Sequence, residues 1–133
     1  MSPAANDPGV GPLATLLGIR RVAMADGRCE FALTAGPQHM NPHGVVHGGV
    51  IYTLVDFAMG GALTSVLEAD ERCATLELKI NYLAAACAGD VRAEARVVSR
   101  TRRVAVLEAQ AYGPEPRLLA LATGTFYVQA SAS

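Results

Sequence analysis

The sequence predicts an α+β domain in which a curved antiparallel sheet wraps around one long central helix. Two observations lead to this prediction. Residues 48–67 form a long apolar stretch of the length and composition of a buried helix. From residue 75 onward the hydrophobic period changes to two, which is typical of half-buried strands. A helix that is apolar on most sides needs a sheet around it, and its remaining surface would need a second subunit.

The composition indicates a single ordered domain. The chain has 133 residues, of which 51% are hydrophobic and 17% are charged, enough for one core. A net charge of −1 without a basic face argues against nucleic acid as the main partner. Cys29, Cys73 and Cys87 are widely spaced and form no CxxC pattern. They predict reduced thiols in a cytoplasmic protein rather than a disulfide framework or a zinc site.

The chain before the long helix divides into a disordered segment and the start of the domain. Residues 1–12 are rich in glycine and proline and lack the features of a signal peptide, so we expect disorder there. The folded domain is expected over residues 13–130. Its first element should be a short helix at residues 13–17. A β-hairpin should follow, with strands at 19–25 and 28–34 and a turn at Asp26-Gly27, and then an irregular loop at 35–46.

One carboxylate interrupts the long helix. Residues 48–67 could span a membrane by length, but the stretch contains Asp56 and four glycines, and the chain after it alternates like a soluble sheet. We therefore expect a buried helix and no membrane association. A charge in an apolar helix costs several kcal/mol unless a function or a partner compensates it. Asp56 is thus the first candidate for catalysis, and a structural carboxylate paired with an arginine or capping a partner helix is the alternative.

Four strands are expected after the helix, in an antiparallel meander. In the first, Leu76, Leu78, Ile80 and Tyr82 alternate with polar residues and should share one buried face. The strands are expected at residues 75–83, 91–97, 105–112 and 117–128. Polar turns at 100–103 and 113–116 should connect the last three strands.

The start of the helix carries a motif. The pattern is Asn41-x-x-Gly44-x-x-His47-Gly48-Gly49, then Asp56 nine residues after the histidine, with later segments at 75–83 and 124–126. It resembles the PaaI-type hotdog-fold acyl-CoA thioesterases. The resemblance implies a hotdog fold, homodimers with one continuous sheet, and often dimer-of-dimers tetramers. It also implies hydrolysis of an acyl-CoA substrate without a metal or cofactor.

Helix geometry suggests roles for three of these residues. Gly48 and Gly49 open the helix, where backbone N–H groups are unsatisfied and carry the positive end of the helix dipole. We assign the Gly48 N–H to the thioester oxygen, as in an oxyanion hole, and expect Gly49 to allow close approach of the substrate. Asp56 would act as general base or as nucleophile.

The remaining candidate site residues are chosen because their spacing matches the family pattern. Asn41 would orient the substrate or donate a second hydrogen bond, and Thr75 would hold the attacking water together with Asp56. His47 would steady the loop or lie near the sulfur.

Two arginines, and two positions that differ from the family pattern, concern the binding of coenzyme A. Arg102 and Arg103 lie in a polar turn that is ordinarily solvated, and phosphate binding is the alternative for them. The chain departs from the family at Ala84-Ala85, where Arg-Pro is frequent, and at Thr101, where glycine is usual. The nucleotide contacts are therefore the least defined part of the expected site.

Spacing gives two further expectations. Asp56 lies about 12 Å beyond Gly48 along the helix, at ~1.5 Å per residue, which is too far for both to contact one carbonyl group. A complete site would then combine Gly48 of one subunit with Asp56 of another, in a two-fold dimer with shared sites. His39, His43 and His47 are interrupted by proline and glycine, so the sequence predicts no metal site.

The predicted function is hydrolysis of an aryl- or short- to medium-chain acyl-CoA. One alternative is a hydratase or dehydratase acting on acyl thioesters, which usually places an Asp and His pair differently. The other is a non-catalytic acyl-CoA-binding module acting as a sensor.

Overall fold

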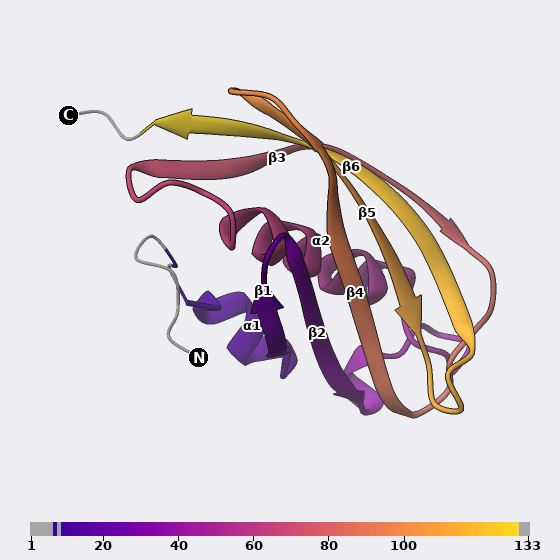
Figure 1. Ribbon diagram of the computed structural model, residues 1–133. Helices are drawn as coiled ribbons and strands as arrows, with labels where there is room; N and C mark the ends of the chain where they lie inside the picture. Colours follow the sequence, from indigo (N-terminus) through magenta and orange to yellow (C-terminus); the bar gives the residue numbers. More distant parts are fainter. Residues whose placement is uncertain (1–6, 8, 131–133) are drawn as a thin grey trace.

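The computed structural model describes residue 7 and residues 9–130. A curved antiparallel sheet wraps around one long helix (Figure 1), which confirms the predicted α+β architecture. No helix in the described part of the chain is long and apolar enough to cross a membrane. The elements, in order along the chain, are α1 (Gly11–Leu17), β1 (Arg20–Ala25), β2 (Arg28–Ala35), the 3-10 helix η1 (Pro37–His39), α2 (Gly48–Thr64), β3 (Glu71–Tyr82), β4 (Gly89–Arg100), β5 (Val104–Tyr112) and β6 (Leu118–Ala130).

The strand order differs from the predicted meander. The six strands follow the order β1-β2-β4-β5-β6-β3, so β3 pairs with β6 and not with β4. Alternation along a strand shows which side chains face the core, but it does not specify the neighbouring strand. As a result, β3 forms one edge of the sheet, alongside α2.

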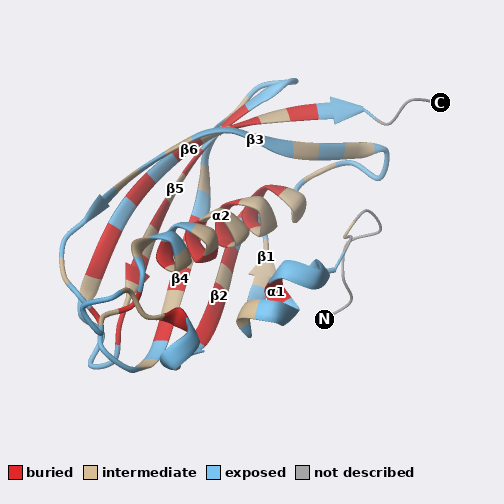
Figure 2. Ribbon diagram, turned by 180° about the vertical axis from the view of Figure 1, so that it is seen from behind, coloured by how far each residue is buried: buried red, intermediate tan, exposed pale blue. Residues whose placement is uncertain are grey.

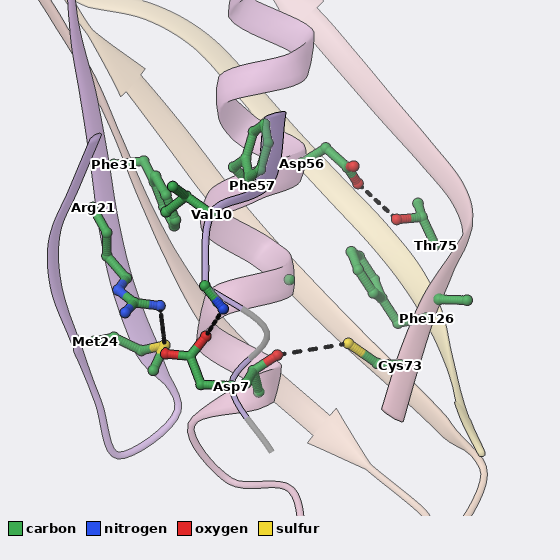
Figure 3. A pocket seen from close by; sticks show the side chains of 16 residues that line it. Asp7, Val10, Arg21, Met24, Phe31, Asp56, Phe57, Cys73, Thr75 and Phe126 are labelled. Carbon is green, nitrogen blue, oxygen red and sulfur yellow. Dashed lines mark hydrogen bonds and ion pairs between the residues drawn. The ribbon is translucent and has the colours of Figure 1, made fainter. Parts of the chain in front are cut away.

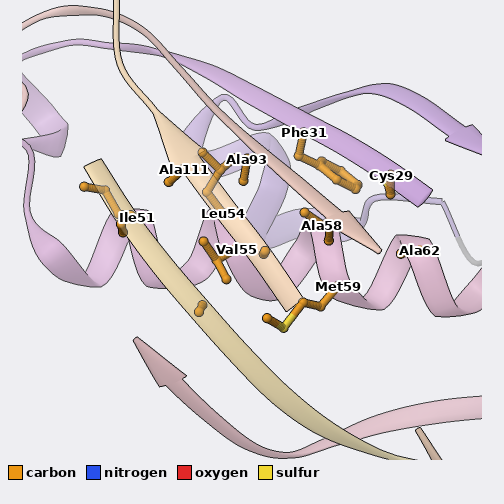
Figure 4. Close-up of a cluster of buried hydrophobic side chains, with 14 of the residues drawn as sticks. Cys29, Phe31, Ile51, Leu54, Val55, Ala58, Met59, Ala62, Ala93 and Ala111 are labelled. Atoms are coloured by element: carbon orange, nitrogen blue, oxygen red, sulfur yellow. The ribbon is translucent and has the colours of Figure 1, made fainter. Parts of the chain in front are cut away.

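The core lies between α2 and the concave face of the sheet. The helix buries the face made by Ile51, Leu54, Val55, Ala58, Met59, Ala62 and Leu63 (Figure 4). Figure 2 shows the matching buried residues on the strands behind it. The fit is closest at Gly61, where an added Cβ would lie 2.5 Å from the Sγ atom of Cys29. The other face of α2 carries Gly49, Tyr52, Thr53 and Asp56, and it is exposed or half-buried.

The N-terminal boundary of the folded part lies earlier than expected. Helix α1 begins at Gly11, so residues 11 and 12 belong to it rather than to a disordered segment. Pro12 suits the first turn of a helix, where its missing N–H is not needed, and Ala14 buries this helix against the core. Residues 1–6 and residue 8, also expected to be disordered, lie outside the described part, as do residues 131–133.

A bulge at Leu76 changes which residues of β3 face the helix. Thr75 pairs with Phe126 and Glu77 pairs with Thr125, so Leu76 is an extra residue without a partner. The expectation that Leu76 is buried was therefore wrong, because its side chain is 61% exposed. Cys73 and Thr75 before the bulge, and Leu78, Ile80 and Tyr82 after it, all lie on the side of β3 that contacts α2 or the core.

Candidate active site

Asp56 and Thr75 meet at the open face of α2. Asp56 lies in the middle of the helix, and Thr75 lies just before the bulge in β3. The Thr75 hydroxyl donates a 2.7 Å hydrogen bond to Asp56 Oδ1 (Figure 3). Both residues line a cavity, and Asp56 is half-buried rather than enclosed. The carboxylate thus has one oxygen held by Thr75 and a second oxygen available for another donor.

The start of α2 is organised by His47. Its Nδ1 atom accepts a 2.8 Å hydrogen bond from the Gly49 N–H, which makes His47 the N-cap of the helix. The Gly48 N–H donates to no group among the described residues. Of the two glycines proposed to meet the substrate, Gly48 therefore keeps a free donor at the positive end of the helix dipole, whereas Gly49 does not.

Asn41 shapes the loop that leads into the helix. Its Oδ1 atom accepts hydrogen bonds from the N–H groups of His43, at 2.8 Å, and Val45, at 3.3 Å. The carbonyl side of the amide is therefore used within the loop, and only the amide nitrogen is left to face a ligand. His39 is buried and links Gly36 to Leu17 through its two ring nitrogens, so it is a packing residue. His43 is exposed.

Tyr82, expected from sequence only as a residue of a strand, contacts the start of α2. Its hydroxyl donates a 2.7 Å hydrogen bond to the Gly48 carbonyl. Burial, with a smaller contribution from Tyr52, raises the pKa of Tyr82, so the phenol stays protonated and remains a donor. A Cβ on Gly48 would lie 3.1 Å from the ring, which shows how closely Tyr82 covers the helix start. The alternation of β3 placed Tyr82 on the helix side, but no pattern identified its partner.

Arg102 and Arg103 lie away from this helix start within the same chain. They occupy the turn between β4 and β5, and both are exposed. Arg100, at the end of β4, donates to the Val66 carbonyl just past the C-terminal end of α2. The arginine turn therefore lies near the opposite end of the helix from Gly48.

A cavity of about 370 Å³ adjoins Asp56 (Figure 3). It follows one face of α2 from Asp56 through Gly60 to Thr64, so it extends about 12 Å along the helix. All three phenylalanines of the chain line it: Phe31, Phe57 and Phe126. The rings of Phe31 and Phe57 lie 5.5 Å apart between centroids, in a tilted arrangement. The cavity thus offers an aromatic wall next to a carboxylate.

Two apolar residues near the start of α2 do not border this cavity. Leu54 is fully buried in the core, and Val50 lies outside the cavity lining. Leu54 turns toward the sheet, whereas the cavity follows the face of the helix that carries Asp56.

Cys73 is close to Asp56, but its thiol is not activated as a nucleophile. It lines the cavity, and its sulfur lies 3.9 Å from the Thr64 hydroxyl. Burial raises the pKa of the Cys73 thiol, and the nearby Asp56 charge raises it further. The thiol is therefore protonated at neutral pH, and the ionisable group that lies beside it in the cavity is the Asp56 carboxylate.

Comparison with known proteins assigns the family. Residues 43–120 match the model of the thioesterase superfamily, which is more than half of the chain. The chain belongs to this superfamily. A phenylacetic acid degradation protein PaaI from Thermus thermophilus, solved as a mutant, superposes with a TM-score of 0.81 at 30% identity, covering 88% of this chain and 98% of that one. The predicted PaaI-type hotdog fold is confirmed.

Two relatives that are similar in sequence differ in how specifically they are named. The chain is 38% identical to a protein of Saccharolobus solfataricus with the general name of an esterase, over 64% of this chain and 56% of that one. The aligned region thus spans little more than half the length of that relative. The present chain is also 28% identical to the 1,4-dihydroxy-2-naphthoyl-CoA hydrolase of Listeria monocytogenes, over 88% of this chain and 95% of that one.

Proposed function

We propose that this protein is an acyl-CoA thioesterase that hydrolyses an aryl-acyl thioester to the free acid and coenzyme A. The observation that carries the proposal is the cavity that begins at the Asp56–Thr75 pair and is walled by all three phenylalanines. Aromatic rings pack on one another with a gain beyond simple area burial. The names of the two better-described similar proteins also refer to an aromatic acid and an aromatic acyl-CoA.

In the proposed reaction, Asp56 acts as a general base. Thr75 holds Oδ1 at 2.7 Å, and the attacking water donates to the other oxygen. The water oxygen attacks the thioester carbon as Asp56 takes the proton, and negative charge develops on the carbonyl oxygen. The Gly48 N–H stabilises that charge. The carbon–sulfur bond then breaks, the leaving thiolate takes the proton that Asp56 received from water, and the acid and coenzyme A leave without any metal or cofactor.

The two halves of this machinery lie on different parts of α2. Gly48 and Asp56 are about 12 Å apart along the helix, so one chain does not bring both to one thioester. We propose that a two-fold dimer does so, with each site formed by Gly48 and Asn41 of one chain and Asp56 and Thr75 of the other. We also propose that the exposed Arg102 and Arg103 bind the phosphates of coenzyme A.

The edge strand β3 supports such a dimer. It pairs with β6 on one side only, and its other edge has no partner within the described chain. Leu76 and Tyr82 of this strand, and Leu83 directly after it, are apolar residues that are 61%, 50% and 53% exposed. A long apolar edge is an aggregation hazard unless another strand covers it. Pairing of β3 with its symmetry copy would join two sheets into one and bring a second chain next to Thr75.

A panel of acyl-CoA substrates tests the proposed function. Purified protein is mixed with arylacetyl-, short-chain and medium-chain acyl-CoAs, and released coenzyme A is measured with a thiol-reactive dye. We expect turnover, with kcat/KM highest for the aryl substrates because their rings contact the phenylalanine wall. A protein that binds these compounds in calorimetry but releases no coenzyme A would be the non-catalytic acyl-CoA-binding module instead.

A further inference from the structure

Helix α2 runs antiparallel to the edge strand β3, beside which it lies (Figure 1). Two contacts show this direction. At the start of the helix, the Tyr82 hydroxyl at the end of β3 donates a 2.7 Å hydrogen bond to the Gly48 carbonyl. Further along the helix, Asp56 accepts a 2.7 Å hydrogen bond from Thr75, which comes earlier in β3. Each level along the helix therefore corresponds to a level along the free edge of the sheet.

The shared site of the proposed function fixes where a two-fold axis must cross the helix. In that site Gly48 of one subunit and Asp56 of the other meet at one thioester, so the two residues must lie at the same level. For two antiparallel helices the axis then passes midway between these positions, at Tyr52, which is about 6 Å from each at ~1.5 Å per residue. The Tyr52 hydroxyl donates a 3.2 Å hydrogen bond to the Leu78 carbonyl. On β3, the axis therefore lies at the level of Leu78.

The charges on either side of Leu78 favour the same position. Glu77 and Lys79 flank it, both are exposed, and strand alternation turns them to the face of the sheet away from the helix. Neither side chain forms an ion pair with another described residue. Their neighbours on β6 are the uncharged Thr125 and Thr123. The free edge thus presents two opposite charges that lack a partner in this part of the chain.

We propose that the two β3 strands of the active dimer pair about a two-fold axis at Leu78, so that Lys79 of each subunit forms an ion pair with Glu77 of the partner subunit. This inference rests on the proposed function. An axis shifted by one residue, to Glu77 or to Lys79, would place that side chain opposite its own copy, and like charges directly opposite each other destabilise a strand pair. The Leu78 carbonyl has two lone pairs, so it can accept a backbone N–H of the other strand as well as the Tyr52 hydroxyl.

Cysteine cross-linking reads this register directly. The variants Glu77→Cys, Lys79→Cys and the combination of both are made in a Cys87→Ser background, which lacks the exposed native thiol. Directly opposite residues have Cα atoms about 4.5 to 5.5 Å apart, which a disulfide spans, whereas opposite-strand residues offset by two positions lie beyond ~7 Å. With the axis at Leu78, we expect cross-linked dimers on a non-reducing denaturing gel from the double variant only. The Cys87→Ser parent should run as a single chain.

Other cross-linking patterns would overturn the inference. Cross-linking of Lys79→Cys alone would place the axis at Lys79, and cross-linking of Glu77→Cys alone would place it at Glu77. A protein that is dimeric in gel filtration but forms no cross-link in any of the three variants would pair through a different surface. A protein that is monomeric would remove both this inference and the shared site.

A charge exchange tests whether the ion pairs stabilise the dimer. Lys79→Glu places two glutamates opposite each other at both contacts, so differently tagged dimers should exchange subunits about 10- to 100-fold faster than the wild-type protein. Adding Glu77→Lys restores opposite charges and should return the exchange rate to within about threefold of wild type. Arg20→Glu, an exposed reversal on β1 at the other edge of the sheet, is the control and should not change the rate. A wild-type rate for Lys79→Glu, or no recovery in the double variant, would contradict the ion pair.

Activity measured on the same proteins separates this inference from the proposed function. The oxidised double cysteine variant should hydrolyse acyl-CoA within about a factor of two of its reduced form, because the disulfides hold the register that the shared site needs. Loss of activity on oxidation with recovery on reduction would show that the locked register is not the active one. The predicted cross-links in a protein whose wild type hydrolyses no acyl-CoA would contradict only the thioesterase assignment. Hydrolysis by the wild type with a different cross-linking pattern would leave that assignment standing and remove this inference.

Discussion

Replacing Asp56 with asparagine is expected to lower kcat for the best acyl-CoA by about 10²- to 10⁴-fold. Asparagine keeps the shape of the side chain and can still accept the Thr75 hydrogen bond, but it cannot take a proton from water. Because Asp56 is half-buried at the open face of α2, the fold should survive. Steady-state release of coenzyme A measures the loss, and thermal unfolding and gel filtration check that structure and assembly are retained.

The control for this variant removes a similar charge elsewhere. Asp70→Asn changes an exposed carboxylate in the turn that follows the helix, outside the cavity, and should leave kcat within a factor of about two. If Asp56→Asn also turned over at close to the wild-type rate while remaining folded, Asp56 would be a structural carboxylate and the proposed mechanism would be wrong.

Gly48→Pro is expected to lower kcat by about 10²- to 10³-fold relative to Gly48→Ala. Proline removes the N–H assigned to the oxyanion, and it fits the first position of a helix. The preceding residue, His47, already has the extended conformation (φ −60°, ψ 134°) that proline requires of its neighbour. Both variants add a Cβ that lies 3.1 Å from the Tyr82 ring, so the alanine variant controls for that contact.

The comparison of these two variants isolates one donor. We expect Gly48→Ala to retain most of kcat, provided that Tyr82 moves by a few tenths of an ångström. Similar rates for the alanine and proline variants, with both folded, would show that the Gly48 N–H does not meet the developing charge. Circular dichroism of the two proteins checks that α2 still forms.

The helix and its carboxylate were predictable because they depend on local sequence. The apolar stretch predicted α2, and the cost of a charge within it singled out Asp56. Family spacing then connected Asp56 to Thr75, and the structure brings these two side chains to 2.7 Å. His47 was expected to steady the loop or lie near the sulfur, and in the structure it accepts a hydrogen bond from the Gly49 N–H as the N-cap of α2.

The conformation of β3 was not predictable in the same way. Strict alternation would place Thr75 on the opposite face from Leu78, yet both lie toward the helix. The bulge at Leu76 reconciles the two, and it inserts a residue that looks like an ordinary apolar strand position in sequence. The pairing of β3 with β6 is likewise a long-range choice that periodicity does not encode.

The cavity also depends on long-range contacts. Phe31, Phe57 and Phe126 come from β2, α2 and β6, and only the folded sheet gathers them beside Asp56. Asp7 belongs to the stretch that was expected to be disordered because it is rich in glycine and proline, yet its carboxylate forms an ion pair with Arg21 of β1.

The central claim is that each site is shared between two chains, and a mixed dimer tests it most directly. Gly48→Pro and Asp56→Asn chains are co-expressed with different tags, and the dimer carrying both tags is purified and assayed. In a shared site, one of the two sites then combines an intact Gly48 with an intact Asp56, so we predict about half of wild-type activity per dimer. Each parent homodimer should remain at about 1% or less. A mixed dimer no more active than its parents would contradict the shared site, because it would place Gly48 and Asp56 of one chain in the same active site.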